Sequence, residues 1–297
     1  MEESKRLWLQ EHLRCPSCRT VGIEIGVHEG RCPRCGRRYP TRNGALDCID
    51  SDTASRFNIV DTENISDHVY DGNAGTILQR VLGRGGHVLD CGSGKRQFRQ
   101  EHLIQVEIAP YDNVDVLAVN QELPFVDGCF DAVFSLSVLE HVSDPFASAR
   151  ELARVLKPGG VLYIDLPFLQ AEHGYPHHYF DATREGLRKL FDGLLKVDGH
   201  LVPDAGHPIQ VLLQVLGIYH DHLPPAERQT FAGLTVGEIL ARRPWTEWIG
   251  DPLMTALSEE GRWTIAATTQ ALLRKPTDAD DEERAVGGVT PSNLPGF

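Results

Sequence analysis

The stretch HVLDCGSGKRQF (residues 87–98) begins like the nucleotide-binding turn of an α/β protein. A short apolar strand that contains Asp90 is followed by Gly92 and Gly94, and glycine lets the backbone approach a ligand closely. Arg96 then stands where a third glycine would be expected. The stretch therefore predicts a ligand at the end of a strand, but it does not by itself identify that ligand.

Strand and helix patterns alternate along the chain beyond this turn. Further strands are expected at residues 103–108, 114–119, 130–137, 161–168 and 194–203, and a closing strand at 263–275. Helices are expected at residues 73–83, 144–157 and 181–191, with a helical insertion at about 204–260. Strands separated by helices predict an α/β fold with a doubly wound, mostly parallel sheet over residues 85–275. The polar tail, residues 276–297, is expected to be disordered.

The formal charge of −13 over 297 residues is unevenly distributed. Residues 1–45 carry nine Lys and Arg against five Glu, an excess of +4, so the remainder carries −17. An acidic surface repels polyanions, which argues against a general nucleic-acid binder and leaves only the N-terminal region for a local contact. Apolar runs such as residues 161–169 are too short to span a bilayer. With no apolar signal core at the N-terminus, we expect a cytoplasmic protein without a membrane partner.

Four of the seven cysteines lie in two Cys-x-x-Cys motifs near the N-terminus. These cysteines are Cys15, Cys18, Cys32 and Cys35. Two such motifs supply four thiolates for a tetrahedral Zn²⁺ ion, and a closed four-thiolate site is structural because no coordination position stays open for a substrate. We therefore predict a zinc ribbon at residues 1–50, followed at 51–84 by a linker or lid and the first helix. Free or redox-active thiols are the alternative interpretation.

Polar residues stand at the carboxyl ends of the predicted strands, where ligands bind in open α/β sheets. Glu107 ends the second strand, where an acid can accept hydrogen bonds from both hydroxyls of a ribose. Asn120 and Gln121 follow the third strand, where they could contact the edge of an adenine. Ser135 lies near the end of the fourth strand.

The block LPFVDGCFDAVFSLSVLEHVSDPFASARELARVLKPGG (residues 123–160) resembles, almost throughout, the signature of class I S-adenosylmethionine-dependent methyltransferases of the type 11 group. The resemblance covers about residues 85–200 and implies an enzyme whose cofactor is S-adenosyl-L-methionine. By position, it implies cofactor contacts with the methionine part from Asp90, Gly92 and Gly94, with the ribose from Glu107, and with the adenine from Asn120 and Gln121. The family often has an acid where this chain has Asn120. The cysteine region similarly resembles the zinc ribbons that precede some bacterial methyltransferase domains.

The cations of the glycine turn raise a separate hypothesis. Lys95 or Arg96 can pair with the methionine carboxylate of the cofactor, and a solvated pair at the start of a short helix is the alternative. A NAD-type turn is a weaker interpretation of the same loop. Gln97 stands at the last position of Gly-x-Gly-x-x-Gly, and a NAD-binding fold gives no reason for the block at 123–160.

The loop HGYPHHYFD (residues 173–181) follows the fifth strand, where members of the family place groups that face the methyl acceptor. The surrounding stretch, residues 168–191, resembles a subgroup of these enzymes found beside glycosyltransferases in bacterial polysaccharide clusters. A neutral imidazole can remove a proton from an acceptor hydroxyl or amine. The candidates for this role are His173, His177, His178, Tyr179 and, with less support, His141 after the fourth strand. Packing and loop bracing by these residues, or a second metal ion on His177, His178 and Asp181, are the alternatives.

Three functions fit these observations. The first is methyl transfer to an oxygen or nitrogen of a small molecule, a sugar or secondary metabolite, by a chain that could form a homodimer through its apolar segment 209–218. The second is an RNA methyltransferase, because zinc-ribbon rRNA guanine methyltransferases share this order of domains. The third is a non-catalytic scaffold whose altered glycine loop has lost the cofactor. Glu107 and the acidic bulk of the chain favour the first.

Overall fold

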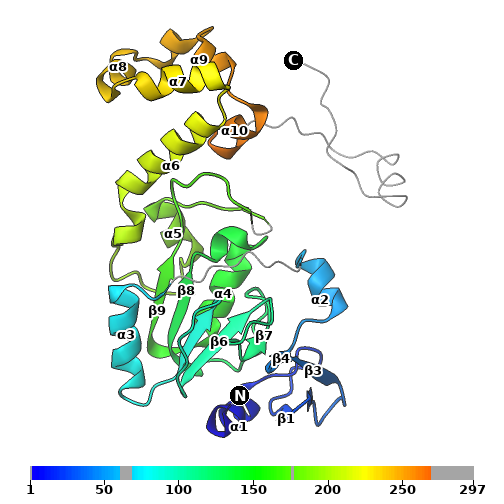
Figure 1. Ribbon diagram of the computed structural model, residues 1–297. Helices are drawn as coiled ribbons and strands as arrows, with labels where there is room; N and C mark the ends of the chain where they lie inside the picture. Colours follow the sequence, from blue (N-terminus) through cyan, green and yellow to red (C-terminus); the bar gives the residue numbers. More distant parts are fainter. Residues whose placement is uncertain (1, 61–68, 175–176, 269–297) are drawn as a thin grey trace, which may run out of the picture. The chain divides into compact units, whose positions relative to one another are not determined.

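The computed structural model describes residues 2–60, 69–174 and 177–268 of the chain. Within these residues, five parallel strands form the centre of the sheet (Figure 1). They are β5 (Val88–Cys91), β6 (Leu103–Glu107), β7 (Val116–Leu117), β8 (Phe130–Leu136) and β9 (Leu156–Asp165). Their order across the sheet is β7-β6-β5-β8-β9, so the chain runs outward from β5 on one side and from β8 on the other. This is the doubly wound topology that the alternation predicts, and its switch point lies between the carboxyl ends of β5 and β8.

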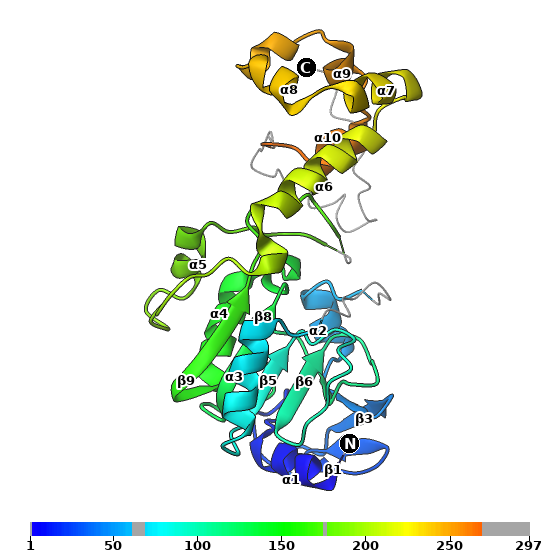
Figure 2. The same cartoon turned by 60° about the vertical axis from the view of Figure 1, so that its left-hand side comes forward.

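Helices cover both faces of these strands. Val88 belongs to the same buried cluster as residues of α3 (Gly72–Leu82), whereas Leu89 belongs to the cluster of α4 (Pro145–Val155), because successive side chains of a strand point to opposite faces. Every residue of β5 and β6 is buried, as expected for parallel strands that are covered on both sides. Figure 2 shows α3 lying across the strands.

Both helices begin at an aspartate N-cap. The Asp71 carboxylate accepts a hydrogen bond from the Ala74 amide at 2.6 Å, and the Asp144 carboxylate accepts one from the Ala147 amide at 2.9 Å. Pro145 occupies the first turn of α4, where its missing N–H costs nothing. The predicted start of α4 at Asp144 is therefore confirmed.

The cysteine region is joined to the same sheet. Its strands are β1 (Glu24–Ile25), β2 (Glu29–Arg31), β3 (Arg38–Arg42) and β4 (Ala45–Asp47), which pair antiparallel. β4 then pairs in parallel with β7, with Leu46 opposite Val116. The described residues thus form one sheet of nine strands in the order β1-β2-β3-β4-β7-β6-β5-β8-β9. The described residues up to Ile265 form one compact unit.

The helix α1 (Glu3–His12) fastens this region to the strands of the domain. Its Lys5 ammonium lies 3.0 Å from the Asp115 carboxylate, and both side chains are less than a tenth exposed. Its Trp8 ring stacks on His87, which precedes β5, with centroids 4.4 Å apart. The fully buried Leu9 belongs to the same core cluster as Leu89. The cysteine region and the central strands therefore share one hydrophobic core.

Short helices dominate the chain after β9. They are α5 (Arg184–Leu190), α6 (Pro208–Asp221), α7 (Pro225–Gly233), α8 (Val236–Ala241), α9 (Pro252–Thr255) and α10 (Glu259–Thr264). The predicted helices at 181–191 and in the insertion are present. Within the described residues, α6 leaves much of its apolar surface exposed, and no helix is both long and apolar enough to cross a membrane.

The prediction of a strand at residues 194–203 is wrong. These residues form no strand, and Leu201 and Val202 are 53% and 70% exposed. An alternating pattern forms a strand only against a neighbour, and β9 is the last strand of the described sheet.

The prediction of a closing strand at 263–275 fails at its start. Residues 263 and 264 belong to α10, whose N-cap Ser258 accepts a hydrogen bond from the Gly261 amide at 3.1 Å. Residues 269–275, the expected lid residues 61–68 and the tail 276–297 lie outside the described residues.

Candidate functional site

The glycine turn after β5 is held by a buried ion pair. The Arg96 guanidinium lies 3.1 Å from the Asp90 carboxylate, and the two side chains are 6% and 0% exposed. Tyr70 donates a further hydrogen bond to Asp90 at 2.6 Å. Burial raises the pKa of Asp90, while Arg96 and Tyr70 oppose that rise. Arg96 thus neutralises an acid of the protein itself, which is a different partner from the cofactor carboxylate of the hypothesis.

Arg96 also fixes the backbone of the turn. Its guanidinium donates to the carbonyl oxygens of Ser93 at 2.9 Å and of Gly92 at 3.3 Å. Gly92 has φ +84°, and a Cβ atom there would stand 2.3 Å from a methyl carbon of Val138. Glycine is therefore required at position 92 by its conformation and by the close approach of Val138, in addition to any ligand.

Glu107 faces the same turn from the end of β6. Its carboxylate accepts hydrogen bonds from the amides of Gly94 at 3.0 Å and Ile108 at 2.7 Å, one on each oxygen. Burial raises the pKa of Glu107, and these two amides counteract the rise. A carboxylate has about four acceptor positions, so both oxygens can still accept a hydroxyl.

Two buried polar atoms near this edge have no hydrogen-bond partner among the described residues. They are the side-chain nitrogen of Asn120 and the hydroxyl of Ser135. The amide oxygen of Asn120 accepts from the Cys91 thiol at 2.8 Å, which turns the amide nitrogen away from β5. Gln121 is also buried, and the Lys95 ammonium lies over the Tyr111 ring, 4.9 Å from its centroid. The structure thus brings the predicted cofactor residues to one edge of the sheet.

A strained turn after β8 leads to the second half of the site. Ser137 adopts φ +55°, which costs a residue other than glycine about 1 kcal/mol. Val138 then lies against Gly92, and the 3₁₀ helix η1 (Leu139–His141) follows. Within it, Glu140 is fully buried, and neither carboxylate oxygen has a hydrogen-bond partner among the described residues. Burial raises the pKa of Glu140 to about 8.

Two of the predicted histidines, His141 and His173, lie close to Glu140, and His178 packs against His173. The ring centroids of His141 and His173 are 5.1 Å apart, and those of His173 and His178 are 4.3 Å apart. A ring nitrogen of His141 lies 3.9 Å from Glu140. Burial lowers the pKa of His141, which favours the neutral ring. The structure therefore unites residues of η1 with the loop that follows β9.

The remaining two candidates face another partner. The Asn58 amide nitrogen lies 2.7 Å from Nε2 of His177 and 3.3 Å from the Tyr179 hydroxyl. His178 instead lies 3.1 Å from Asp181. The alternative of a second metal ion on His177, His178 and Asp181 is therefore wrong in its grouping, because His177 turns away from the other two.

Three residues of the site are absent from the sequence-based predictions. Asn58 and Tyr70 come from the segment that the sequence predicts to be a linker or lid. Glu140 directly precedes His141 in the apolar run VLEHV (138–142), and an acid in such surroundings is a signal of burial that could have drawn attention to it.

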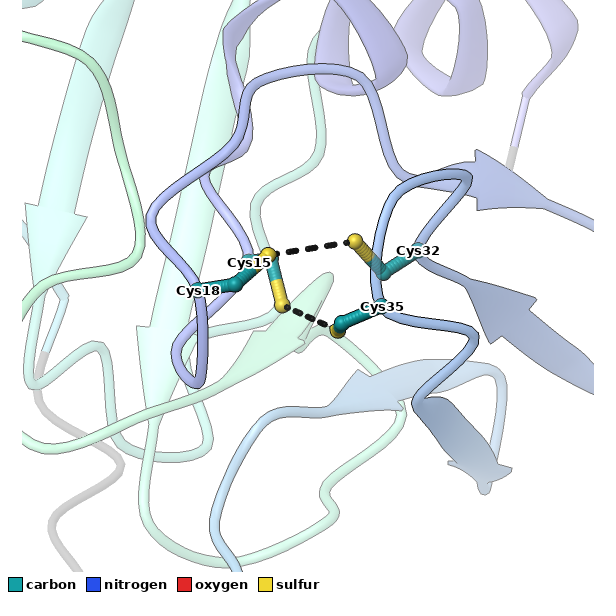
Figure 3. A group of neighbouring side chains, drawn as sticks. All are labelled: Cys15, Cys18, Cys32 and Cys35. Atoms are coloured by element: carbon teal, nitrogen blue, oxygen red, sulfur yellow. Dashed lines mark hydrogen bonds between the residues drawn. The ribbon is translucent and has the colours of Figure 1, made fainter.

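The four cysteine thiols converge, two from each Cys-x-x-Cys motif (Figure 3). The sulfur atoms of Cys15 and Cys35 are 3.6 Å apart, and those of Cys18 and Cys32 are 3.5 Å apart. A tetrahedral zinc ion with bonds of about 2.3 Å to sulfur separates its ligands by about 3.8 Å. The Tyr39 hydroxyl lies 3.0 Å from the Cys15 sulfur, a contact typical of the surroundings of a metal-bound thiolate. The cluster therefore fits the predicted metal.

Comparisons with known proteins show which family the central strands resemble. Residues 89–164, from β5 to β9, match the family described as methyltransferase domain. An uncharacterized 37.1 kDa protein in transposon TN4556 of Streptomyces fradiae is 27% identical over 157 residues, 48% of this chain and 43% of that protein. The ubiquinone/menaquinone biosynthesis C-methyltransferase UbiE of Pseudoalteromonas translucida is 28% identical over 196 residues, 59% of this chain and 72% of that protein.

Among solved structures, a 1,6-didemethyltoxoflavin N1-methyltransferase of Burkholderia thailandensis with S-adenosylhomocysteine is 21% identical. The match covers 44% of this chain and 70% of that one, with a TM-score of 0.35. The chain spans less than half the length of the Streptomyces relative. The chain carries a methyltransferase domain, as the resemblance predicts.

Proposed function

We propose that the protein transfers a methyl group from S-adenosyl-L-methionine to an oxygen or nitrogen of a small molecule, a sugar or a secondary metabolite. The observation that carries the proposal is the edge at the switch point of the sheet. There, the Glu107 carboxylate keeps free acceptor positions beside the glycine turn, and Asn120 presents a buried donor without a partner among the described residues.

These residues match the polar groups of the cofactor. Glu107 would accept hydrogen bonds from the ribose hydroxyls, and the side-chain nitrogen of Asn120 would donate to a ring nitrogen of adenine. When bound, the cofactor supplies an electrophilic methyl group on a sulfonium sulfur. Lys95 is the candidate partner for its carboxylate because it lies in the same glycine turn, whereas Arg96 contacts Asp90.

Transfer to a hydroxyl or amine requires that the acceptor lose one proton. We assign this role to Nε2 of His177, because the Asn58 amide nitrogen 2.7 Å from it is a donor, so Nε2 carries the lone pair that a base needs. Asn58 lies beside Nε2 and would orient the ring until an acceptor replaces its amide. The relative from Pseudoalteromonas is named a C-methyltransferase, so identification of the methylated atom in the product tests this part of the proposal.

The cofactor site is tested by calorimetric titration with S-adenosylhomocysteine. We expect Glu107→Gln to weaken binding about 10- to 100-fold, because charge-assisted hydrogen bonds contribute about 1.5–3 kcal/mol. Glu101→Gln is the matched control, since Glu101 is exposed and precedes β6 at its opposite end. Undetectable binding to the wild-type protein would instead support the non-catalytic scaffold. Equal affinity of wild type and Glu107→Gln would disprove the ribose contact.

An RNA substrate has less support. Within the described residues, six of the nine basic side chains in the first 45 positions lie within salt-bridge distance of carboxylates. They are Lys5, Arg6, Arg14, Arg37, Arg38 and Arg42. A cation that lies beside a carboxylate attracts phosphate groups less strongly. The local excess of +4 therefore overstates the attraction of this region to RNA. A steep fall of RNA affinity with salt would contradict this proposal.

The cysteine cluster completes the proposed function as a structural zinc site. Four thiolates close the coordination of Zn²⁺, and the metal supplies folding energy to a region that is small by itself. Reduced cysteines are typical of the cytoplasm, which is the location that we propose.

A further inference from the structure

Glu140 is the most unusual buried group of the described residues. Its side chain is fully buried, and neither of its oxygens has a hydrogen-bond partner within the described chain. A buried polar group without a partner costs about 1–3 kcal/mol, and more when it carries charge. Such a group needs a physical explanation, and a bound ion is one that compensates the cost.

The imidazoles beside Glu140 are oriented as metal ligands are. Nδ1 of His141 lies 2.7 Å from the His177 carbonyl oxygen, and Nδ1 of His173 lies 3.0 Å from the Ala171 carbonyl oxygen. A hydrogen bond from Nδ1 to a backbone carbonyl fixes the tautomer that leaves the Nε2 lone pair available, which is the usual arrangement around a metal ion. One potential ligand atom from each of Glu140, His141 and His173 lies within 4.8 Å of the others.

His178 is a bracing residue rather than a fourth ligand. Its Nδ1 accepts a hydrogen bond from the His173 amide at 3.2 Å, and its Nε2 lies 3.1 Å from Asp181. Both ring nitrogens are therefore engaged, and the ring supports His173 at a centroid distance of 4.3 Å.

We propose that Glu140, His141 and His173 form a mononuclear site for a divalent first-row transition metal ion, in addition to the cysteine cluster. Two imidazoles and one carboxylate suit Fe²⁺, Co²⁺ or Zn²⁺, and such a set of three ligands leaves coordination positions open. Ligands of one ion are about 3–3.5 Å apart, so binding requires shifts of about 1 Å in the side chains.

The place of this site suggests what occupies its open positions. Val138, two residues before Glu140, contacts the glycine turn, and the histidine loop follows β9. If the proposed methyltransferase function holds, the ion lies on the acceptor side, and it would favour acceptors that present a hydroxyl or carboxylate oxygen as a ligand. The metal site itself does not depend on that function.

The test is a titration of the full chain with Co²⁺ after the cysteine cluster has been filled with Zn²⁺. We expect one further equivalent of Co²⁺ with visible absorption bands but without the near-ultraviolet band of a thiolate ligand. Glu140→Gln and His173→Asn should each weaken this binding about 100-fold or more, because even changes beyond the direct ligands cost 10- to 100-fold. His177→Asn, in the same loop, is the matched control and should leave the Co²⁺ affinity unchanged.

Thermal unfolding provides a second measurement. Glu140→Gln replaces a buried carboxyl group that has no hydrogen-bond partner among the described residues by a neutral group of nearly the same shape, so without metal the variant should unfold at about the same temperature as the wild type. Added Co²⁺ should raise the unfolding temperature of the zinc-loaded wild type and of His177→Asn, but not that of Glu140→Gln. The proposal is overturned if the wild type binds no Co²⁺ beyond its cysteine cluster, or if both ligand variants bind it as the wild type does. Loss of cofactor binding in Glu107→Gln with intact Co²⁺ binding would separate the two proposals.

Discussion

Arg96 illustrates how the surroundings of one residue decide its role. In the sequence it stands in an altered glycine turn, where a cation suggests an anionic ligand. In the structure its guanidinium contacts Asp90 and two carbonyl groups of the same turn. The missing third glycine is therefore replaced by a side chain that holds the turn from within, and the anion that the cation suggests is an acid of the protein.

This assignment predicts a large cost for removing the guanidinium. Arg96→Met should lower the free energy of unfolding by about 3–5 kcal/mol, because it leaves Asp90 buried without a counter-ion. Urea denaturation measures this loss. Arg99→Met is the control, since Arg99 is exposed and its replacement should change stability by no more than about 0.5 kcal/mol.

The double variant Asp90→Asn with Arg96→Met separates charge from packing. It should recover part of the loss, because neither ion then remains buried alone. A cost of less than about 1 kcal/mol for Arg96→Met alone would contradict the role of Arg96 as a counter-ion.

Glycine 36 offers a second test at the scale of one residue. It follows the second Cys-x-x-Cys motif with φ +70°, and a Cβ atom there would meet nothing within 4 Å. Gly36→Ala should therefore destabilise the protein by about 1–2 kcal/mol through backbone conformation alone. Gly75→Ala, inside α3 and equally unobstructed, should instead stabilise it by about 0.5–1 kcal/mol. In urea denaturation, the free energy of unfolding should fall for Gly36→Ala and rise for Gly75→Ala. A change in the same direction for both variants would show that backbone conformation does not decide the effect.

At the scale of elements, the sequence predicts what local patterns determine. β5, β6, β8 and α4 lie where buried runs and the N-cap Asp144 place them. The strand expected at 194–203 does not form, because a strand depends on a neighbour that its own residues do not specify. The parallel pairing of β4 with β7 could not be predicted for the same reason, since it joins segments about seventy residues apart.

The candidate site also contains residues whose place could be predicted from the sequence and residues whose place could not. The residues at the carboxyl ends of β5, β6 and β8 could be predicted, because topology brings strand ends together. The sequence does not predict the partner of Arg96 or the separation of His177 from His178, because both depend on side-chain directions in loops. Glu140 was missed because its burial results from tertiary packing around η1.

The contact between α1 and the start of β5 predicts a dependence of stability on pH. Burial lowers the pKa of His87 from 6.5 to about 4, and its ring stacks on Trp8. Between these values the unfolded chain binds a proton that the folded protein does not bind. Stability is therefore complete above pH about 6.5 and is lost progressively as the pH falls toward 4.

The variant His87→Phe retains an aromatic ring against Trp8 and cannot titrate. From pH 7 to pH 5, the wild type should lose about 1 kcal/mol more than this variant in urea denaturation, a value reduced for the partial exposure of the ring. If the free energy of unfolding changed with pH in the same way for both proteins, the titration of His87 would not be the cause of the pH dependence.

At the scale of the whole molecule, the cysteine region and the methyltransferase domain share one sheet and one hydrophobic core, which predicts that they unfold together. β4 extends the sheet at β7, and Lys5 places a buried charge against Asp115. Leu9 and Cys15 belong to the same core cluster as Leu89 and Val106. A change in the cysteine cluster should therefore lower the stability of strands across the whole sheet. A ribbon that is attached only by a linker would not have this effect.

Removal of zinc tests this coupling in the full chain. We expect a chelator to lower the unfolding temperature by about 10 °C in a single transition, because the binding energy of the metal is also folding energy. Hydrogen exchange after chelation should show loss of amide protection in β1 to β4 and also in β7, decreasing toward β9. Cys35→Ser should reproduce the effect, whereas Cys48→Ala, outside the cluster, should retain zinc and protection in β7. Loss of protection that ends at Asp47 would mean that the two regions fold independently despite their shared sheet.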